Sequence, residues 1–388
     1  MIKKIYLIAL LLIIGIQNVS AQDTSKSSIV MDIDSGRILY ENNCNEKRLI
    51  ASTTKIMTAI LAIENTSLEE KVTIGEEVLS MYGTNIYIEV GEKMTIRNLL
   101  YGLMLRSGND AAEAIAIYIG GSEENFAKMM NTKANELGMN NTEFNNPHGL
   151  DDYTRNYSTA YDMALLSKYV YSNATYVEIS QTQKYTTSTQ NKSYLWYNRN
   201  KLLTTYKYCT GGKNGYTPDA GKTLVSTAEK NNLRLTIVTL NDPNIYDTHE
   251  YLYEQTFSKY SNYKIIDKNN FKLENTDYKD TAYIKESFTY PLTLEEKEQV
   301  KTKVTLFNKL EVEDVIGYIE IMLNEEKIGK INIYNKITKK EEMSFFSKIK
   351  NYLLDILKKL KLGLQNNLNP GPSVPIPLEI NKSDSSTL

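Results

Sequence analysis

The tetrad Ser52-Thr53-Thr54-Lys55 has the residue types and the spacing of a serine nucleophile activated by a lysine. Apolar residues follow it at helical spacing, so Ser52 is predicted in the first turn of a helix with Lys55 one turn on, on the same face; they are Ile56, Met57, Ala59, Ile60 and Ile63. A serine hydroxyl is a weak nucleophile until a base takes its proton, and a partly desolvated lysine with a lowered pKa can be that base. The tetrad therefore predicts covalent catalysis, helped by the positive potential of a helix N-terminus.

A Ser-x-x-Lys tetrad alone says little, because it arises by chance about once or twice in a chain of this length. Residues 347–350 are a second match, but they lie in a lysine-rich amphipathic segment, and we interpret that copy as incidental. The first copy has to be judged by the motifs that accompany it.

Two companion motifs follow along the chain. Ser107 and Asn109 come after an apolar run, and residues 110–113 behind them are interpreted as a helix N-cap with a capping-box-like acid. This places Ser-x-Asn on a turn between helices. Lys213-Asn214-Gly215-Tyr216 precedes a predicted β-hairpin with strands at 223–228 and 233–240, so its lysine is expected beside a strand edge. Each motif alone also fits a polar loop or a glycine turn, and their order supplies the specificity.

In this order the three motifs are similar to the motif set of penicillin-binding proteins and serine β-lactamases. Further segments resemble low-molecular-mass D-alanyl-D-alanine carboxypeptidases of the peptidase S11 family, and the resemblance covers residues 28–262; the segments are 29–32, 35–40, 51–59, 99–112, 146–151, 158–162 and 200–203. The resemblance implies an α+β fold of the penicillin-binding/β-lactamase-like transpeptidase type. It comprises an antiparallel sheet covered by helices and a helical lobe that carries Ser107 and Asn109, followed by a small all-β domain and an amphipathic helix.

The resemblance also implies the catalytic roles. Ser52 would attack the carbonyl between the two terminal D-alanines of a peptidoglycan stem peptide, with Lys55 as proton acceptor, and water would hydrolyse the acyl-enzyme. Ser107 would relay a proton toward the departing D-alanine nitrogen, and Asn109 would orient Lys55 and the substrate backbone. β-Lactam antibiotics are the implied acylating inhibitors.

The substrate-binding residues implied in the same way are Lys213, Asn214, Gly215 and Tyr216. Lys213 would attract the substrate carboxylate, and the backbone N–H groups of Ser52 and Tyr216 would bind the oxyanion. One position departs from the family pattern, because Asn214 stands where the family has a threonine whose hydroxyl contacts that carboxylate. An asparagine amide also donates hydrogen bonds, but its longer side chain predicts altered substrate preference, slower acylation or weaker β-lactam binding.

Two alternatives stay open beside the carboxypeptidase. A serine β-lactamase shares the acylation step but needs an added general base, and no convincing Glu-x-x-x-Asn motif is placed for one. A catalytically attenuated peptidoglycan-binding protein would follow if Asn214 disabled the site.

Other chemistries find less support in the sequence. The chain has two histidines, His148 and His249, without a paired His/Glu spacing for zinc, and no Gly-x-Ser-x-Gly elbow or phosphate-binding glycine loop. We therefore expect no metal and no cofactor, and we interpret His148 as a structural loop residue. A net charge of −2 over 388 residues gives no sign of nucleic-acid binding. Cys44 and Cys209 are predicted to be free or buried thiols, because a protein of this size needs no disulfide.

The chain divides into five predicted segments. Residues 1–21 have two lysines, an apolar run shorter than the roughly 20 residues of a membrane span, and a small-residue cleavage site, which indicates a secretory signal peptide and an exported protein at the membrane face or in the cell wall. Residues 22–262 form the predicted peptidase domain and residues 263–338 a small β-rich domain, with strands at 282–285, 300–307, 315–323 and 327–334. Residues 339–365 predict a basic amphipathic helix, and residues 366–388 a disordered tail. We expect residues 345–362 to contact the membrane surface peripherally, with packing on the β-rich domain as the alternative.

Overall fold

The computed structural model describes residues 22–336, apart from 191, 275, 277 and 308–314, together with residues 349–354 and 356. Within this part the chain forms two compact units. The first runs up to Ile265 and also includes Phe288–Val300, and the second consists of Ile266–Ser287 and the residues from Lys301 onward. The predicted signal peptide and tail lie outside the described residues, and the predicted domain limits remain predictions.

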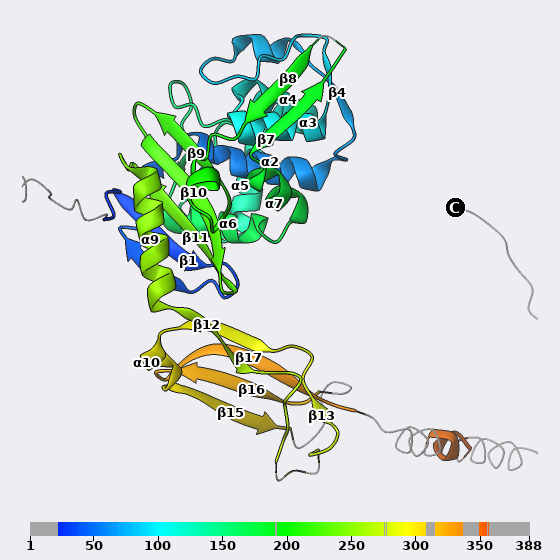
Figure 1. Ribbon diagram of the computed structural model, residues 1–388. Helices are drawn as coiled ribbons and strands as arrows, with labels where there is room; N and C mark the ends of the chain where they lie inside the picture. Colours follow the sequence, from blue (N-terminus) through cyan, green and yellow to red (C-terminus); the bar gives the residue numbers. More distant parts are fainter. Residues whose placement is uncertain are drawn as a thin grey trace, which may run out of the picture. The chain divides into compact units, whose positions relative to one another are not determined.

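The first unit is built on a five-stranded antiparallel sheet (Figure 1). Its order is β2-β1-β11-β10-β9, so the strand that carries the Lys-Asn-Gly motif is an edge strand. The strands are β1 (Ser27–Asp32), β2 (Ile38–Asn42), β9 (Cys209–Thr217), β10 (Gly221–Lys230) and β11 (Leu233–Leu240). The predicted hairpin is confirmed by β10 and β11, which pair antiparallel with Val225 opposite Val238.

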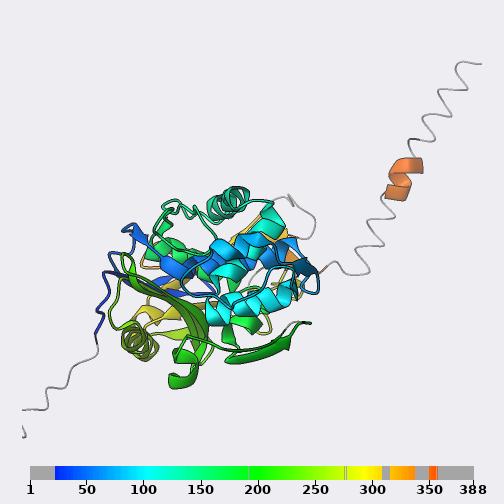
Figure 2. The same ribbon diagram turned by 90° about the horizontal axis from the view of Figure 1, so that it is seen from above.

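Helices cover both faces of this sheet, which is why β1 is buried along its whole length. Helix α9 (Ile245–Lys259) and the short α8 (Leu202–Thr205) close one face over a core of Val30, Leu224, Leu235, Ile237, Leu252 and Tyr253. Helix α6 (Ala160–Val170) packs on the other face, with α2 (Lys55–Asn65) beyond it. Seen from above, α9 and the cyan helices lie on opposite sides of the green strands (Figure 2).

A helical lobe stands beside the sheet and carries the Ser-x-Asn motif. Its helices are α3 (Ile96–Tyr101), a π-helical turn at Gly102–Arg106, α4 (Asn109–Gly120), α5 (Glu123–Glu136) and α7 (Ala174–Gln181). Three short ladders complete the unit: β3 (Arg48–Leu49) with β6 (Tyr157–Ser158), β4 (Lys71–Thr73) with β5 (Lys93–Thr95), and β7 (Lys184–Ser188) with β8 (Ser193–Tyr197). Local sequence sets several helix starts, because side-chain oxygens accept backbone N–H groups of the first turn at Thr95, Ser122, Thr159 and Asn173.

The predicted N-cap at residues 110–113 is wrong. Helix α4 begins at Asn109, and its N-cap Gly108 offers no side-chain hydrogen bond. The Asp110 carboxylate instead accepts backbone N–H groups from residues 86, 87 and 88 of a neighbouring loop, at 3.0, 2.7 and 3.2 Å. Glu113 makes no capping contact, and its Oε2 is buried without a hydrogen-bond partner. Asp110 therefore fixes a loop beside the helix rather than the start of the helix itself.

The second unit contains a four-stranded antiparallel sheet in the order β13-β17-β16-β15. Its strands are β13 (Ala282–Tyr283), β15 (Val300–Leu306), β16 (Val315–Leu323) and β17 (Glu326–Asn335), and they confirm the predicted β-rich segment. Asn324 and Glu325 have φ of 48° and 70° in the predicted turn, the left-handed conformation that tight hairpins require. A separate two-stranded ladder, β12 (Ser261–Ile266) with β14 (Phe288–Leu292), and the following α10 (Leu294–Lys297) belong almost entirely to the first unit.

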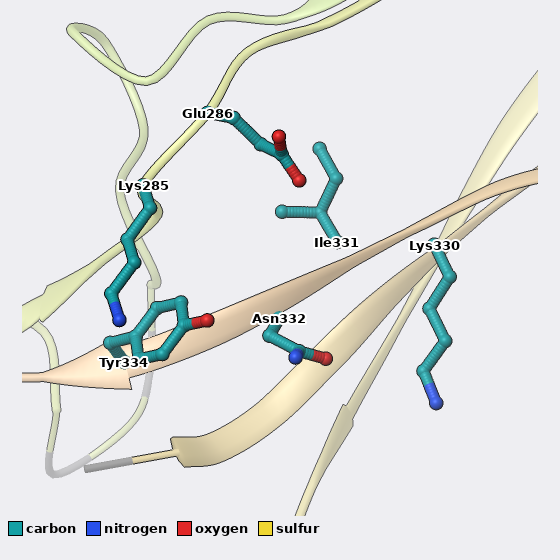
Figure 3. Close-up of a pocket in the computed structure, with 6 residues that line it drawn as sticks. All are labelled: Lys285, Glu286, Lys330, Ile331, Asn332 and Tyr334. Carbon is teal, nitrogen blue, oxygen red and sulfur yellow. The ribbon is translucent and has the colours of Figure 1, made fainter. Parts of the chain in front are cut away.

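One face of β17 borders a pocket of the second unit (Figure 3). Lys285 Nζ lies 3.9 Å from the ring centroid of Tyr334, and the two side chains stand side by side in the figure. The lining residues are Lys285, Glu286, Lys330, Ile331, Asn332 and Tyr334. None of the predicted site residues is among them.

Part of the predicted amphipathic helix is described. Residues 349–354 and 356 are helical, and their apolar side chains face solvent, with Leu353 53% exposed and Ile356 38% exposed. The rest of residues 339–365 lies outside the described residues. In the part of the chain that the structure covers, no helix combines the length and the apolar character needed to cross a bilayer.

Candidate active site

Ser52 lies in a short 3-10 helix, Ala51–Thr54, that leads directly into α2. The carbonyl of Ile50 anchors this turn, because it accepts the Thr53 hydroxyl at 2.6 Å and the Thr223 hydroxyl of β10 at 3.1 Å. Ala51 has a φ of 47°, in the left-handed region that costs a residue with a side chain of order 1–3 kcal/mol. The nucleophile candidate is therefore held against the sheet by a strained, hydrogen-bonded turn.

Lys55 is fully buried at the start of α2, and its amine has three oxygen neighbours. Its Nζ lies 3.1 Å from Ser52 Oγ and donates to Asn109 Oδ1 at 2.7 Å and to the backbone oxygen of His148 at 2.6 Å. Burial lowers the pKa of Lys55 well below its ordinary value, and the positive charge of Lys213 lowers it further. An uncharged amine in this position can accept the Ser52 proton.

The second motif reaches the site through Asn109. Ser107 ends the π-helical turn in the left-handed conformation with a φ of 67°, and Asn109 opens α4. Both side chains are buried, and Asn109 Nδ2 donates to the backbone oxygen of Tyr82 at 2.7 Å while its Oδ1 faces Lys55. Among the described residues, the Ser107 hydroxyl makes no hydrogen bond to Lys55 or Ser52. The structure thus joins Asn109, but not Ser107, directly to the Ser52–Lys55 pair.

The third motif lies on the edge strand β9. Lys213 is 1% exposed and donates from Nζ to the backbone oxygen of Asn214 at 2.6 Å. Burial, and then the charge of Arg199, lowers the pKa of Lys213 to about 7. Gly215 stands against the nucleophile turn, since a Cβ on it would lie 2.7 Å from the backbone nitrogen of Ser52. A glycine is therefore required for β9 to approach Ser52 this closely.

A groove runs past the exposed side of β9. Asn214 is partly exposed and Tyr216 is 64% exposed along it, and Arg199 and Lys222 contribute positive charge. Its lining also includes Lys201, Gly215, Pro243, Asn244, Ile245, Tyr246 and Asp247. This arrangement can attract the anionic end of a ligand to the strand edge.

Three contributors to the site were missed by the sequence interpretation. The His148 carbonyl contacts Lys55, but a backbone oxygen carries no sequence signal. A Cβ on Gly149 would lie 2.0 Å from the Ala51 oxygen, so only a glycine (φ of 84°) lets this loop pack directly against the nucleophile turn. Arg199 donates to Thr84 Oγ1 at 3.1 Å from an exposed position; a single arginine in a strand–turn region is not distinctive by itself.

The His148 ring has a structural environment, as interpreted from the sequence. Its Nδ1 accepts the backbone N–H of Leu150 at 3.1 Å, and its Nε2 lies 3.6 Å from Glu123 Oε1. Burial and then the charge of Lys55 lower the pKa of His148 to about 3. Cys44 and Cys209 are both free thiols, and burial raises the pKa of each to about 11, so neither offers a reactive thiolate.

About four fifths of the chain resembles solved structures of penicillin-binding carboxypeptidases. Penicillin binding protein 5 from Haemophilus influenzae aligns with a TM-score of 0.67 and 26% identity, over 81% of this chain and 97% of that one. The carboxypeptidase DacD from Francisella tularensis aligns with a TM-score of 0.64 and 26% identity, over 82% and 94%. The predicted fold class is confirmed: the fold is that of the penicillin-binding protein carboxypeptidases.

The sequence comparison identifies the family within this class. The sequence model of peptidase S11, described as D-alanyl-D-alanine carboxypeptidase, matches residues 16–244, and the chain belongs to this family of serine peptidases. The carboxypeptidase DacF of Bacillus subtilis is 40% identical over 216 residues, 54% of this chain and 55% of the relative. DacA of Haemophilus influenzae is 29% identical over 369 residues, 87% and 91% of the two chains. The chain thus spans about half the length of the Bacillus relative and most of the Haemophilus one.

Proposed function

We propose that this protein is a serine D-Ala-D-Ala carboxypeptidase that removes the terminal D-alanine from peptidoglycan stem peptides. The observation that carries the proposal is the buried Lys55 amine, 3.1 Å from Ser52 Oγ and held by Asn109 and the His148 carbonyl. Such an amine, with its pKa lowered, is an effective general base for a serine hydroxyl. Membership of the carboxypeptidase family supports the choice of substrate class.

Acylation begins when Ser52 Oγ attacks the carbonyl carbon between the two D-alanines and its proton passes to Lys55. The oxyanion accepts hydrogen bonds from the backbone N–H groups of Ser52 and Tyr216, which the tight approach of Gly215 to Ser52 supports. The C–N bond then breaks, and the departing amine takes the proton from Lys55 through Ser107. Ser107 lies two residues before Asn109, whose Oδ1 accepts a hydrogen bond from Lys55. D-Alanine leaves, and the peptide remains as an ester on Ser52.

Deacylation reverses the proton path. Water attacks the ester carbonyl and gives a proton to Lys55, the C–O bond to Ser52 breaks, and Ser52 Oγ recovers its proton. The product is a stem peptide shortened by one residue. Asn109 keeps the amine aligned in both halves, because its amide is anchored at Tyr82 and at Lys55 together.

The terminal carboxylate of the substrate binds at the β9 edge. Lys213 supplies the nearest positive charge, and Arg199 adds a second one from the rim of the groove. Asn214 takes the place of the family's threonine and donates from its amide. Two cations around one carboxylate compensate for a less favourable contact at Asn214.

We further propose that the protein is exported by residues 1–21 and associates peripherally with the extracytoplasmic face of the cell membrane through residues 345–362. The exposed apolar side chains of residues 349, 353 and 356 support the second point, because an amphipathic helix inserts such a face between lipid headgroups. Flotation of the full chain with anionic vesicles, against a variant with Ile349→Lys and Leu353→Lys, tests it. Equal flotation of both proteins contradicts peripheral binding through this helix.

The direct test of function measures D-alanine release from a pentapeptide ending in D-Ala-D-Ala, together with intact mass after penicillin. Ser52→Ala should lose both signals, and Ser347→Ala, the serine of the second tetrad, should keep both. Release with a stable penicilloyl adduct supports a penicillin-sensitive carboxypeptidase. Rapid, sustained penicillin turnover would establish a β-lactamase, and absence of both signals would establish a non-catalytic binding protein.

A further inference from the structure

Three side chains of the metal-ligand type, two carboxylates and one imidazole, lie close together in the helical lobe and the loop after it. Glu113 comes from α4, Glu123 from the first turn of α5, and His148 from the loop that follows. One carboxylate oxygen of each glutamate and one ring nitrogen of the histidine all lie within 4.8 Å of one another. Glu113 and His148 are 5% and 6% exposed, while the Glu123 side chain is 39% exposed, so the cluster opens to solvent on the Glu123 side.

One buried oxygen of the cluster has no hydrogen-bond partner. Glu113 Oε2 is buried and accepts no hydrogen bond. Among the described residues, no lysine or arginine forms an ion pair with Glu113 or Glu123, and the distance of 3.6 Å from His148 Nε2 to Glu123 Oε1 is too long for a hydrogen bond. A buried polar oxygen without a partner is costly, and here it belongs to a set of two carboxylates and one imidazole.

We propose that Glu113, Glu123 and His148 bind a divalent transition-metal ion of the Zn²⁺ or Mn²⁺ type, with water completing its coordination. Oxygen and imidazole donors suit these ions, and metal–ligand bonds of about 2.0–2.2 Å place tetrahedral ligands about 3.4 Å apart. The separation of 3.6 Å between His148 Nε2 and Glu123 Oε1 already matches that spacing. Sequence motifs do not reveal this site, because its ligands come from three elements at unrelated spacings.

Binding through Nε2 has a defined proton requirement. In the metal-free protein Nδ1 accepts the Leu150 N–H, so a neutral ring carries its proton on Nε2. Metal binding moves that proton to Nδ1, and the Leu150 N–H then has to turn away. The ring tautomer is therefore a signature of occupancy that does not depend on enzyme activity.

The ion would be structural. It would tie α4 and α5 to the loop whose His148 carbonyl contacts Lys55 at 2.6 Å, without touching the substrate. This inference is independent of the proposed carboxypeptidase activity, since a penicillin-binding fold of any activity could hold the same ion.

The test uses the purified full chain after removal of metals by chelation. Calorimetric titration with Zn²⁺ and with Mn²⁺ should show one site per chain for at least one ion, and Mg²⁺ should bind far more weakly. The chain has two histidines, so nitrogen-15 ring spectra are simple to assign. His148 should change its tautomer on binding, while His249, whose two nitrogens contact Ser226 and Thr239, should not.

Variants separate the cluster from adventitious surface binding. Glu113→Gln and Glu123→Gln should each weaken binding by about 100-fold, while Glu124→Gln, an exposed neighbour paired with Lys128, should leave it unchanged. If Glu113→Gln fails to fold, the more exposed Glu123→Gln carries the test. Absence of saturable binding by either ion, binding in the cluster variants as tight as in the parent protein, or an unchanged His148 tautomer would each overturn the proposal.

Discussion

The two buried lysines of the site are held in different ways. Lys55, at the start of α2, has three oxygen neighbours that come from the nucleophile turn, from α4 and from the loop at His148. Lys213, on the edge strand β9, has one protein acceptor, the carbonyl of the adjacent Asn214. Three protein oxygens therefore surround the first amine, and one protein oxygen accepts from the second.

The difference follows from where each residue lies in the fold. The start of α2 is enclosed on all sides, so its amine needs internal acceptors and keeps a much lowered pKa. Strand β9 is the last strand of its sheet, and the residues that follow Lys213 on it, Asn214 to Tyr216, line the groove that also contains Arg199 and Lys222. This difference is consistent with the roles proposed above, proton transfer for Lys55 and electrostatic attraction for Lys213.

Replacing each lysine by methionine should give the largest difference in activity between the two positions. Lys55→Met removes the proposed base and should lower the acylation rate by about 10⁴-fold or more. Lys213→Met removes one electrostatic contact and should lower kcat/KM by about 10²- to 10³-fold. The measurement is penicillin acylation by intact mass together with D-alanine release.

Thermal unfolding of the same two variants is the control. Methionine fills a similar volume without a buried charge, so both proteins should remain folded with a Tm at or above that of the parent. Similar losses of acylation in both variants, with folding intact, would show that the two lysines do not have separate roles.

The pH dependence of kcat/KM should distinguish the two lysines, because they are proposed to act in opposite protonation states. Burial and Arg199 lower the pKa of Lys213 to about 7, so its ammonium form predominates below that pH and is lost as the pH rises through it. Lys55 must act in its uncharged form, which is favoured as the pH rises. We therefore expect kcat/KM to fall above about pH 7 by up to tenfold per pH unit, as the carboxylate attraction of Lys213 disappears.

A substrate with a C-terminal amide distinguishes this cause from general denaturation. It carries no terminal carboxylate, so its alkaline decline should be absent or much reduced, as should that of Lys213→Met with the ordinary peptide. The same alkaline decline for amide and carboxylate substrates would contradict the role given to Lys213.

The sequence indicated which residues lie near one another better than it indicated the hydrogen bonds between them. The Ser-x-x-Lys spacing brought Ser52 and Lys55 together because helical periodicity is local, although Ser52 lies in a 3-10 turn just before the helix rather than in its first turn. The hairpin behind Lys213 followed from alternation and turn residues. The same local rules misassigned Asp110, whose three loop N–H partners lie more than 20 residues away in the chain. Tertiary contacts of this kind have no local signature.

The Lys55 environment shows the same limit. Its acceptors at Asn109 and His148 are 54 and 93 residues distant, and one of them is a backbone oxygen. Resemblance to a family suggested Asn109, whereas the His148 carbonyl became visible only once the fold placed the loop against α2. The catalytic roles of these residues remain predictions that the variants above test.

A single methyl group should displace the β9 edge from the nucleophile turn. In Gly215→Ala the new Cβ would lie 2.7 Å from the Ser52 nitrogen and 2.6 Å from Thr223 Oγ1, so the strand has to shift. A displacement of about 1 Å at a reacting centre costs on the order of 100-fold in rate. We expect acylation to fall by that amount while Lys55 keeps its contacts.

Gly138→Ala is the matched control for the added methyl. Gly138 has a φ of 75° and open space around it, so alanine should cost about 1 kcal/mol of folding free energy without slowing acylation. Stopped-flow measurement with a chromogenic β-lactam compares the two. Unchanged acylation in Gly215→Ala would mean that β9 does not have to approach Ser52 this closely.

The smallest expected effect concerns the residue that departs from the family pattern. Asn214→Ala removes one side-chain donor near the substrate carboxylate and should lower kcat/KM by about fivefold, the equivalent of about 1 kcal/mol. Asn214→Thr restores a hydroxyl and should keep or raise kcat/KM within the same factor. If Lys213 and Arg199 supply most of the attraction, as proposed, both variants should retain an alkaline decline near pH 7. A loss of 100-fold in Asn214→Ala would instead make the amide a principal carboxylate ligand and would move part of the role assigned to Lys213 onto its neighbour.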